Sequence, residues 1–297
     1  MIDPSAVSSF IPSLCSVFCN IHGVTNMSDQ YLYEDICPRR REAAYPLSFF
    51  LRVESTLHLC MSVLLFSLVF CGEAFSFQIP ETFVYDLTWS GIKAGEASLM
   101  IKKNGGELII TSTTKSAQWL SLFYTVDDWA ESRLPGDVGI KSIGRPANYK
   151  LKIREGKHRK NKEVIFARDA STALYIDYLN GEKKSFDIPS VVFDPLSSFY
   201  HLRTRDLAVG KSVFIPVFDS KKVRDVEIQV LRKEKVKVPA GEFNTVVVKP
   251  LIKSEGIFYR KGEISIWLTD DDKRIPVKLK TEVKIGSVIA HLVRGNY

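Results

Sequence analysis

Thiols are missing from most of this 297-residue chain. All five cysteines lie within the first 71 residues, and none follows Cys71. Disulfide bonds and cysteine-ligated zinc are therefore excluded from residues 77–297. The apolar run from Leu59 to Cys71 is also too short to cross a bilayer comfortably, since a spanning helix needs roughly 20 apolar residues.

That apolar run has the length found in a secretory signal peptide. It is followed by Gly72 to Ser76, where small residues at Ala74 and Ser76 fit the small-x-small cleavage pattern. We expect an export signal over residues 46–76, cleaved after Ser76, and a working protein of residues 77–297 in the periplasm. Residues 1–45 form an upstream extension too long for a normal n-region, which indicates a start site assigned too far upstream.

Other interpretations of this segment stay open. A membrane anchor through residues 54–72 would have to include Glu54 and His58. Lipidation of Cys71 would require a small residue before it, where Phe70 stands. A buried core helix would not explain why the composition changes at residue 77 and why no cysteine follows.

Residues 77–297 are basic and long enough for a single domain. They hold 37 Lys and Arg against 27 Asp and Glu, a net charge of +10, whereas residues 1–76 carry −3. Outside the cytoplasm, the available polyanions are lipid headgroups, lipopolysaccharide and acidic glycans. We therefore expect no nucleic-acid partner and no cofactor. Because the excess is diffuse, a solvated surface explains it equally well.

After residue 80 the sequence alternates with a period of two. Phe83, Tyr85, Leu87 and Trp89 point one way, and tight turns such as Asn180-Gly181 separate successive alternating segments. About a dozen strands follow one another without interleaved helices, including one expected over residues 164–168. The pattern predicts a mainly β domain, a single antiparallel meander forming an open or half barrel.

One segment breaks the alternation. Asp194 suits an N-cap, Pro195 suits the first helical position, and Arg203 falls near the helix end. We expect one short helix here, packed at or in the opening of the barrel. With Leu196 and Phe199 on one side, it either covers an apolar cavity or completes the core.

Four motifs carry a resemblance to a known family: Tyr85 to Gly95, Asp194 to Arg203, Val238 to Phe243, and Ile266 to Pro276. In their order and spacing, residues 80–293 resemble the bacterial exported proteins of the domain of unknown function 3108 family. The resemblance implies an envelope location, a β domain similar to the open barrels of periplasmic lipoprotein carriers, and no assigned reaction. The motif positions, whose role it leaves unknown, are Trp89, Gly91, Gly95, Asp194, Ser197, Tyr200, Arg203, Pro239, Gly241, Trp267, Asp272, Arg274 and Pro276.

The turn motifs have simple physical interpretations. Gly91 and Gly95 are expected to supply positive φ in a hairpin loop, and Pro239 to Gly241 indicates a turn. The run Asp270 to Asp272 suggests calcium, but it lacks the spacing of a calcium loop. We expect a solvated turn in which Asp272 pairs with Arg274, and no metal site.

Asp194, Ser197 and His201 are the residue types of an acyl-transfer triad within eight positions. An N-cap aspartate, however, spends its oxygens on backbone N–H groups, and no Gly-x-Ser-x-Gly elbow is present. We expect a cap and a packing helix rather than a catalytic site.

The densest basic run lies between residues 150 and 162. A strand there would place Lys150, Lys152 and Arg154 on one face. We expect a solvated hairpin, with an anionic-ligand patch as the alternative. The residues of that patch would be Lys150, Lys152, Arg154, Arg159 and Lys160.

These observations predict an exported envelope protein with a binding or assembly role and with a lipid or another amphiphile as the candidate ligand. A hydrolase acting on envelope glycan or lipid, or a structural partner in an envelope complex, is the alternative.

Overall fold

The computed structural model describes residues 78–135, 143–167, 171–219, 221–251, 264–283 and 286–297. The upstream extension expected over residues 1–45 and the export signal expected over 46–76 lie outside these ranges. Within the described ranges, no helix is long and apolar enough to span a membrane.

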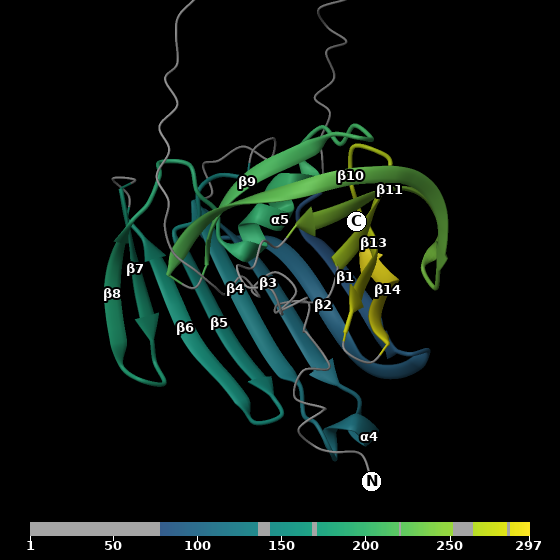
Figure 1. Cartoon of the computed structure of the whole chain (residues 1–297), viewed down its shortest axis with the longest axis horizontal. Coiled ribbons are helices and arrows are strands. Elements are labelled where there is room, and N and C mark those ends of the chain that lie inside the picture. The colour runs from purple at the N-terminus through teal and green to yellow at the C-terminus, as the bar shows by residue number, and fades with distance from the viewer. Residues whose placement is uncertain (1–77, 136–142, 168–170, 220, 252–263, 284–285) are drawn as a thin grey trace, which may run out of the picture. The chain divides into compact units, whose positions relative to one another are not determined.

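The described residues form a single antiparallel sheet of 14 strands with two short helices (Figure 1). Its order is β8-β7-β6-β5-β4-β3-β2-β1-β14-β13-β12-β11-β10-β9, so the first strand pairs with the last. The mainly β, open meander expected from the sequence is confirmed. The strands are β1 (Glu81–Trp89), β2 (Ile92–Asn104), β3 (Glu107–Ser116), β4 (Asp127–Pro135), β5 (Asn148–Glu155), β6 (His158–Phe166), β7 (Thr172–Asp177), β8 (Glu182–Asp187), β9 (Ser212–Asp219), β10 (Lys222–Val238), β11 (Gly241–Leu251), β12 (Ile264–Thr269), β13 (Pro276–Glu282) and β14 (Ser287–Asn296).

The alternation seen in the sequence separates two faces of the sheet. In β1, Phe83, Tyr85 and Leu87 are buried, while the residues between them are partly exposed. These buried side chains belong to one continuous apolar cluster, to which almost all of the remaining strands also contribute. We call the face that carries this cluster the inner face, and the opposite one the outer face.

The sheet is open between its edge strands β8 and β9, and ion pairs cross the opening. Lys162 Nζ of β6 lies 2.7 Å from Asp219 Oδ1 at the end of β9, and both side chains are buried. Lys221 Nζ, in the following turn, lies 2.5 Å from Glu182 Oε2 of β8, and this pair is partly exposed. Side chains thus hold together two edges that no ladder of backbone hydrogen bonds joins.

Aromatic rings and a backbone segment add to this closure. The ring of Phe218 on β9 lies 6.2 Å from the ring of Phe166 and 5.7 Å from that of Phe186, between centroids. Phe193 forms an isolated parallel bridge with Val217, which satisfies part of the free edge of β9. Covering an edge in this way reduces its tendency to pair with other chains.

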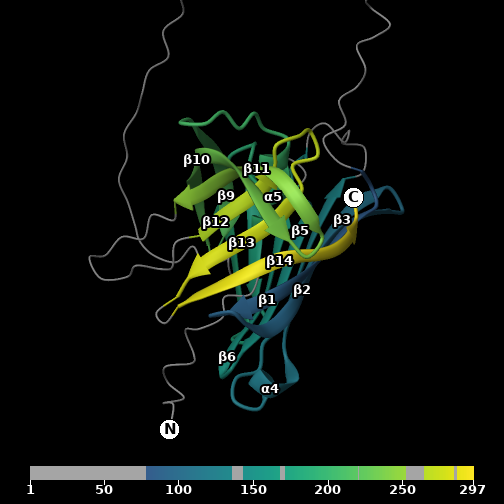
Figure 2. The ribbon, with the colours of Figure 1, turned by 90° about the vertical axis from the view of Figure 1, so that its right-hand side faces the viewer.

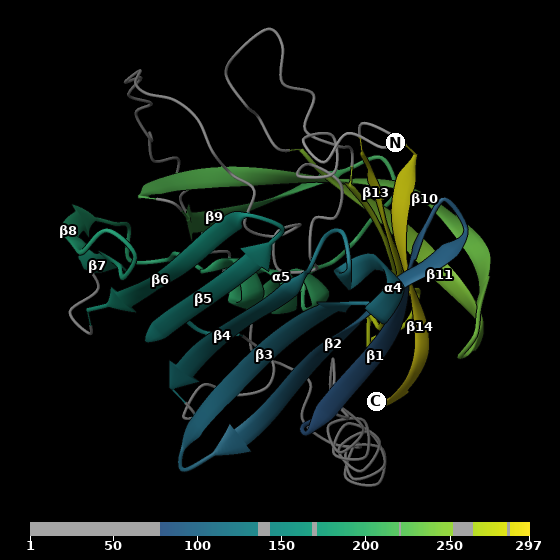
Figure 3. The same ribbon diagram turned by 90° about the horizontal axis from the view of Figure 1, so that it is seen from below.

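The helix expected after Asp194 is present as α5 (Pro195–Arg203). It contacts β3, β4 and β9, and Figures 1 and 3 show it against the sheet. Leu196, Phe199, Tyr200 and Leu202 are all buried in the main apolar cluster. The helix therefore completes the core from the inner face.

A second helix, α4 (Gln118–Ser121), lies at one end of the sheet (Figure 2). Its Leu120 joins Ala94, Tyr124 and Val126 in a separate small cluster, against which Trp89 packs. The alternation placed Trp89 on the same side as Tyr85 and Leu87, but the register of β1 against β2 shifts between Leu87 and Thr88. That expectation is wrong for Trp89.

Two glycines near the first hairpin serve different purposes. Gly91 has φ of 87°, as expected for the turn, but Gly95 has no positive φ, and that expectation is wrong. A Cβ at residue 95 would lie 2.4 Å from the carbonyl oxygen of Lys115, so glycine is needed for the close approach of β3. Gly241, after Pro239 in the β10–β11 turn, has φ of 143°.

Candidate functional site

Asp194 is the centre of a buried hydrogen-bond network at the start of α5. Its carboxylate accepts from the backbone N–H groups of Leu196 and Ser197 at 2.8 and 3.1 Å. It also accepts from the hydroxyls of Ser132 at 2.5 Å and Ser197 at 2.8 Å. Burial raises the pKa of the Asp194 carboxyl, and these hydrogen bonds oppose that shift.

The triad geometry is not formed. The Ser197 hydroxyl donates to Asp194, and no hydrogen bond within the described ranges joins it to His201. The His201 ring instead stacks on Phe193 with centroids 4.3 Å apart. Burial, helped by the positive charge of Arg205, lowers the pKa of His201 to about 4. An acyl-transfer base has to be hydrogen-bonded to its nucleophile, so these residues cap and pack the helix.

Arg203 joins the other end of α5 to the first strand. Its Nη1 and Nη2 donate to the two oxygens of Glu81 at 2.6 and 2.8 Å, and both side chains are fully buried. It also donates to the carbonyl oxygens of Lys273 and Arg274 at 2.8 and 3.0 Å. Burial works against the guanidinium charge, but the bonds to Glu81 outweigh it and the pKa of Arg203 is raised. Sequence reasoning found Arg203 but missed Glu81, which lies 122 positions away.

The turn after β12 is organised by an aspartate other than the one expected. Asp271 Oδ1 accepts from the hydroxyl of Thr269 at 2.6 Å and from the backbone N–H groups of Lys273 and Arg274, each at 3.1 Å. The side chain of Arg274 pairs with Asp270 at 3.3 Å, so the expected Asp272–Arg274 pair is wrong. No group of metal-ligating side chains occurs in the described part of the chain.

The basic run forms the β5–β6 hairpin, and the turn divides its cations between the two faces. Gly156, with φ of 54°, makes a tight turn, so β6 begins at His158 rather than at the expected residue 164. Arg159 stands opposite Arg154 on the outer face, whereas Lys160 stands opposite the buried Ile153. Lys150, Lys152, Arg154 and Arg159 therefore share a face, and Lys160 does not belong with them.

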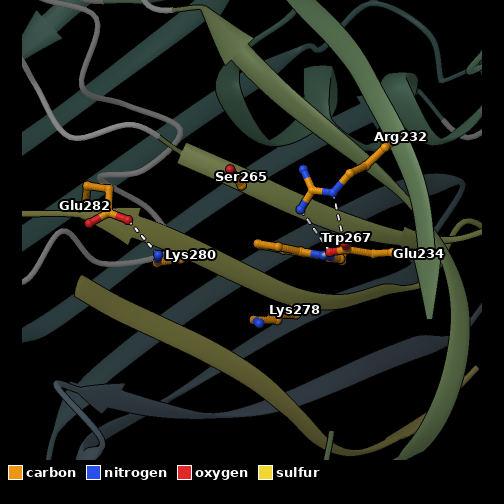
Figure 4. A pocket seen from close by; sticks show the side chains of 7 residues that line it. All are labelled: Arg232, Glu234, Ser265, Trp267, Lys278, Lys280 and Glu282. Atoms are coloured by element: carbon orange, nitrogen blue, oxygen red, sulfur yellow. Dashed lines mark hydrogen bonds and ion pairs between the residues drawn. The ribbon is translucent and has the colours of Figure 1, made fainter. Parts of the chain in front are cut away.

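A separate pocket of about 350 Å³ lies on β10, β12 and β13 (Figure 4). Trp267 is itself buried and contacts the main apolar cluster, but it alternates with Ile266 and Leu268 along β12 and lines the pocket on the outer face. The pocket is lined by Arg232, Glu234, Ser265, Trp267, Lys278, Lys280 and Glu282.

Both carboxylates of this pocket already have partners. Glu234 accepts from Arg232 Nε at 2.8 Å, from Arg232 Nη2 at 3.1 Å, and from the indole N–H of Trp267. The bonds from Arg232, followed by that from Trp267, lower the pKa of Glu234. Glu282 Oε1 lies 2.6 Å from Lys280 Nζ. Each of the two carboxylates is thus already in an ion pair with a cation of the pocket.

Lys278 lines the pocket from β13, next to Trp267. Its Nζ lies 4.6 Å from the centroid of the Trp267 ring, and no described carboxylate lies within 4.0 Å of it. Burial lowers the pKa of Lys278, Glu234 opposes this shift, and Lys280 adds to it. A half-buried ammonium group beside two other cations is an anion-binding feature. Sequence reasoning singled out Trp267 but missed Lys278, Arg232 and Glu234, because the pairing of β10, β11, β12 and β13 brings them together.

Comparison with solved structures gives fold neighbours at low identity. A β-barrel-like protein of the domain of unknown function DUF1849 from Brucella abortus has a TM-score of 0.50 and 11% identity, over 74% of this chain and 98% of that one. A protein from Bacteroides fragilis, provisionally described as exported with a YmcC-like fold, has a TM-score of 0.31 and 10% identity, over 75% and 98%. A provisionally described lipoprotein from Parabacteroides distasonis has a TM-score of 0.33 and 10% identity, over 75% and 98%. At these values the first supports the fold alone, and the other two carry no argument.

No curated protein matches the chain. The model of one family does match it, over residues 84–293, a range that runs from within β1 to within β14 and includes α5 and the outer-face pocket. This chain therefore belongs to DUF3108, a family of proteins of unknown function.

Proposed function

We propose that the protein is an exported, periplasmic binding protein of the bacterial cell envelope, and that the outer-face pocket takes a negatively charged group of an envelope amphiphile. One observation carries the proposal. Lys278 is held half-buried over Trp267, without a carboxylate partner among the described residues, in a pocket whose two glutamates are already paired.

The charges around Lys278 favour an anionic group over a neutral one. Arg232 and Lys280 line the same pocket but are paired with Glu234 and Glu282, so three cations stand against two carboxylates and Lys278 supplies the excess positive charge. A bound anion would also compensate the desolvation of the Lys278 ammonium group. The volume of about 350 Å³ suits a headgroup rather than a whole lipid, so acyl chains would remain outside the pocket.

The composition of the chain is consistent with this location. The apolar run before residue 77 has signal-peptide length, and residues 77–297 lack cysteine and carry a net charge of +10. A basic protein outside the cytoplasm meets anionic lipids and glycans before other polyanions.

The hydrolase alternative has less support. Its best candidates, Ser197 and His201, are engaged in capping and stacking. A role as a structural partner in an envelope complex is compatible with the fold. It does not explain why the ammonium group of Lys278 has no carboxylate partner among the described residues.

Titration of the purified protein with glycerol 3-phosphate, followed by the NMR signal of the Trp267 indole N–H, tests the proposal. Saturable shifts are expected, with glycerol giving none. Lys278→Met should weaken binding at least tenfold, because it keeps the apolar stem and removes the charge.

The chain offers a matched control for this variant. Lys152 lies 5.9 Å from the ring of Trp129 on neighbouring strands, a similar lysine–tryptophan contact outside the pocket. Lys152→Met should leave the affinity unchanged. Equal affinities of wild type and Lys278→Met, or a loss confined to Lys152→Met, would contradict the proposal.

A further inference from the structure

Large apolar side chains are exposed together at the end of the sheet that carries α4. Leu122 and Phe123, in the loop after α4, are 78% and 80% exposed. Ile92 in the β1–β2 hairpin is 63% exposed and Trp119 on α4 is 42% exposed. Exposed apolar groups that gather in this way mark an interaction surface.

The exposed loop is anchored from beneath. The indole N–H of Trp119 donates to the carbonyl oxygen of Lys93 at 2.9 Å, which connects α4 to the β1–β2 hairpin. Leu120 and Tyr124, on either side of the exposed pair, are buried in the small cluster described above. The backbone thus turns Leu122 and Phe123 outward while their neighbours face the protein.

The basic β5–β6 hairpin lies against the same loop. The backbone N–H of Gly156 donates to the carbonyl oxygen of Thr125 at 2.8 Å, and Glu155 forms a bridge with Val126. A Cβ on Gly156 would lie 2.4 Å from the Tyr124 ring, so the contact between the two turns is close. Figure 2 shows α4 beyond the ends of the neighbouring strands, at the same end as the β5–β6 hairpin.

The charge of this combined surface is positive. Lys152, Arg154, Lys157 and Arg159 are exposed on the hairpin, and Glu155 is the acidic residue of its turn. Arg159 Nη1 donates to the carbonyl oxygens of Gly156 and His158 at 2.6 and 2.8 Å, which holds the guanidinium over the turn.

The other charges near α4 leave a small excess of negative charge, two lysines against three carboxylates. Lys93 lies 2.8 Å from both Asp86 and Glu96, and Lys115 stands opposite Asp127 on β3 and β4. The four exposed cations of the hairpin outnumber this excess and Glu155 together, so the charge next to Leu122 and Phe123 is positive.

We propose that the α4 loop and the β5–β6 hairpin dock on an anionic phospholipid bilayer. Leu122 and Phe123 would enter the boundary between headgroups and acyl chains, with Trp119 at headgroup level, and the hairpin cations would contact lipid phosphates. A projecting apolar loop bordered by cations suits a deformable, negatively charged surface better than a preformed protein groove. This surface is distinct from the Lys278 pocket, so either proposal stands without the other.

Co-sedimentation with vesicles of phosphatidylglycerol and phosphatidylcholine in equal parts, and of phosphatidylcholine alone, tests the docking surface. Protein recovered from cells in its natural form is used, so that residues 1–77, whatever their processing, are common to all variants. The expected result is binding that phosphatidylglycerol strengthens and salt weakens. Leu122→Ser with Phe123→Ser should reduce binding at least tenfold, and Lys157→Glu with Arg159→Glu should remove the preference for phosphatidylglycerol.

Phe214→Ser is the matched control, because this side chain on β9 is 61% exposed and far along the chain from α4. It should bind like wild type, and all variants should keep the wild-type melting temperature, since the changed side chains are exposed. Phe123→Trp, in a protein that still binds, should be quenched by phosphatidylglycerol brominated on its acyl chains. Unchanged binding of the Leu122→Ser, Phe123→Ser variant, or absence of that quenching, would overturn the proposal. Loss of a self-associated species in the same variant, without vesicle binding by wild type, would assign the surface to a protein partner instead.

Discussion

Arg203, in the last turn of α5, and Glu81, at the start of β1, form a two-pronged ion pair with N–O distances of 2.6 and 2.8 Å. The guanidinium also lies 5.2 Å from the ring of Phe83 and 5.0 Å from that of Tyr200, measured to the centroids. Because the pair is fully buried and also contacts the turn before β13, it joins three segments that are distant in the sequence. A motif residue that the sequence alone left without a role is thereby explained as structural.

Removing one partner of this pair should be far more harmful than replacing both. Arg203→Met or Glu81→Leu alone should lower the free energy of unfolding by about 3–5 kcal/mol, since each leaves a buried charge uncompensated. The double variant should lose much less than the sum. Urea denaturation of the four proteins measures this, and additive losses would show that the two side chains are not coupled.

The two ion pairs across the sheet opening should contribute unequally to stability, because one is buried and the other is partly exposed. Lys162→Met should cost about 3–5 kcal/mol of stability, because Asp219 is 2% exposed and would stay buried. Lys221→Met, which breaks the partly exposed pair with Glu182, should cost about 0–1 kcal/mol. Comparable denaturant midpoints for the two variants would mean that the edges are not held by the buried pair.

Stability should fall in mild acid, in part through His201. Its pKa is about 4 in the folded protein and 6.5 without the fold, so between these values the unfolded chain binds more protons. Its contribution is therefore complete above pH 6.5 and is lost as the pH falls toward 4. Burial lowers the pKa of His158 and His291 as well, which acts in the same direction.

Melting temperatures measured from pH 7 to 4 test this effect. The melting temperature should fall less steeply with decreasing pH in His201→Gln than in wild type. An equal dependence on pH in the two proteins would contradict the assignment. Ser197→Ala serves as a control that changes the same helix without removing a group that titrates in this range.

The strand pattern and the helix start were predictable because they depend on neighbouring residues. A period of two determines which side chains of β1 are buried, and Asp194 followed by Pro195 determines where α5 begins. The roles of Gly95, Lys160 and Lys278 were not predictable, because each depends on a residue of another strand. Gly95 is required by the close approach of Lys115, and the face on which Lys160 lies depends on the register set by the turn at Gly156. The position of Lys278 depends on its contact with Trp267.

The export hypothesis has a direct chemical consequence. If the chain is cleaved after Ser76, protein recovered from the envelope has an N-terminus at Phe77 and no thiol, because every cysteine lies at or before residue 71. Intact-mass measurement before and after treatment with a thiol reagent should show one unmodified species. A form that gains the mass of the reagent would contradict cleavage and favour the anchor.

The pKa of Lys278, measured by NMR with and without glycerol 3-phosphate, tests the central claim most directly. In the free protein burial should keep this pKa below the ordinary lysine value, and a bound anion should raise it, because a neighbouring negative charge favours the ammonium form. An upward shift of the Lys278 pKa is therefore expected. A pKa of Lys278 that stays the same at saturating glycerol 3-phosphate would contradict it.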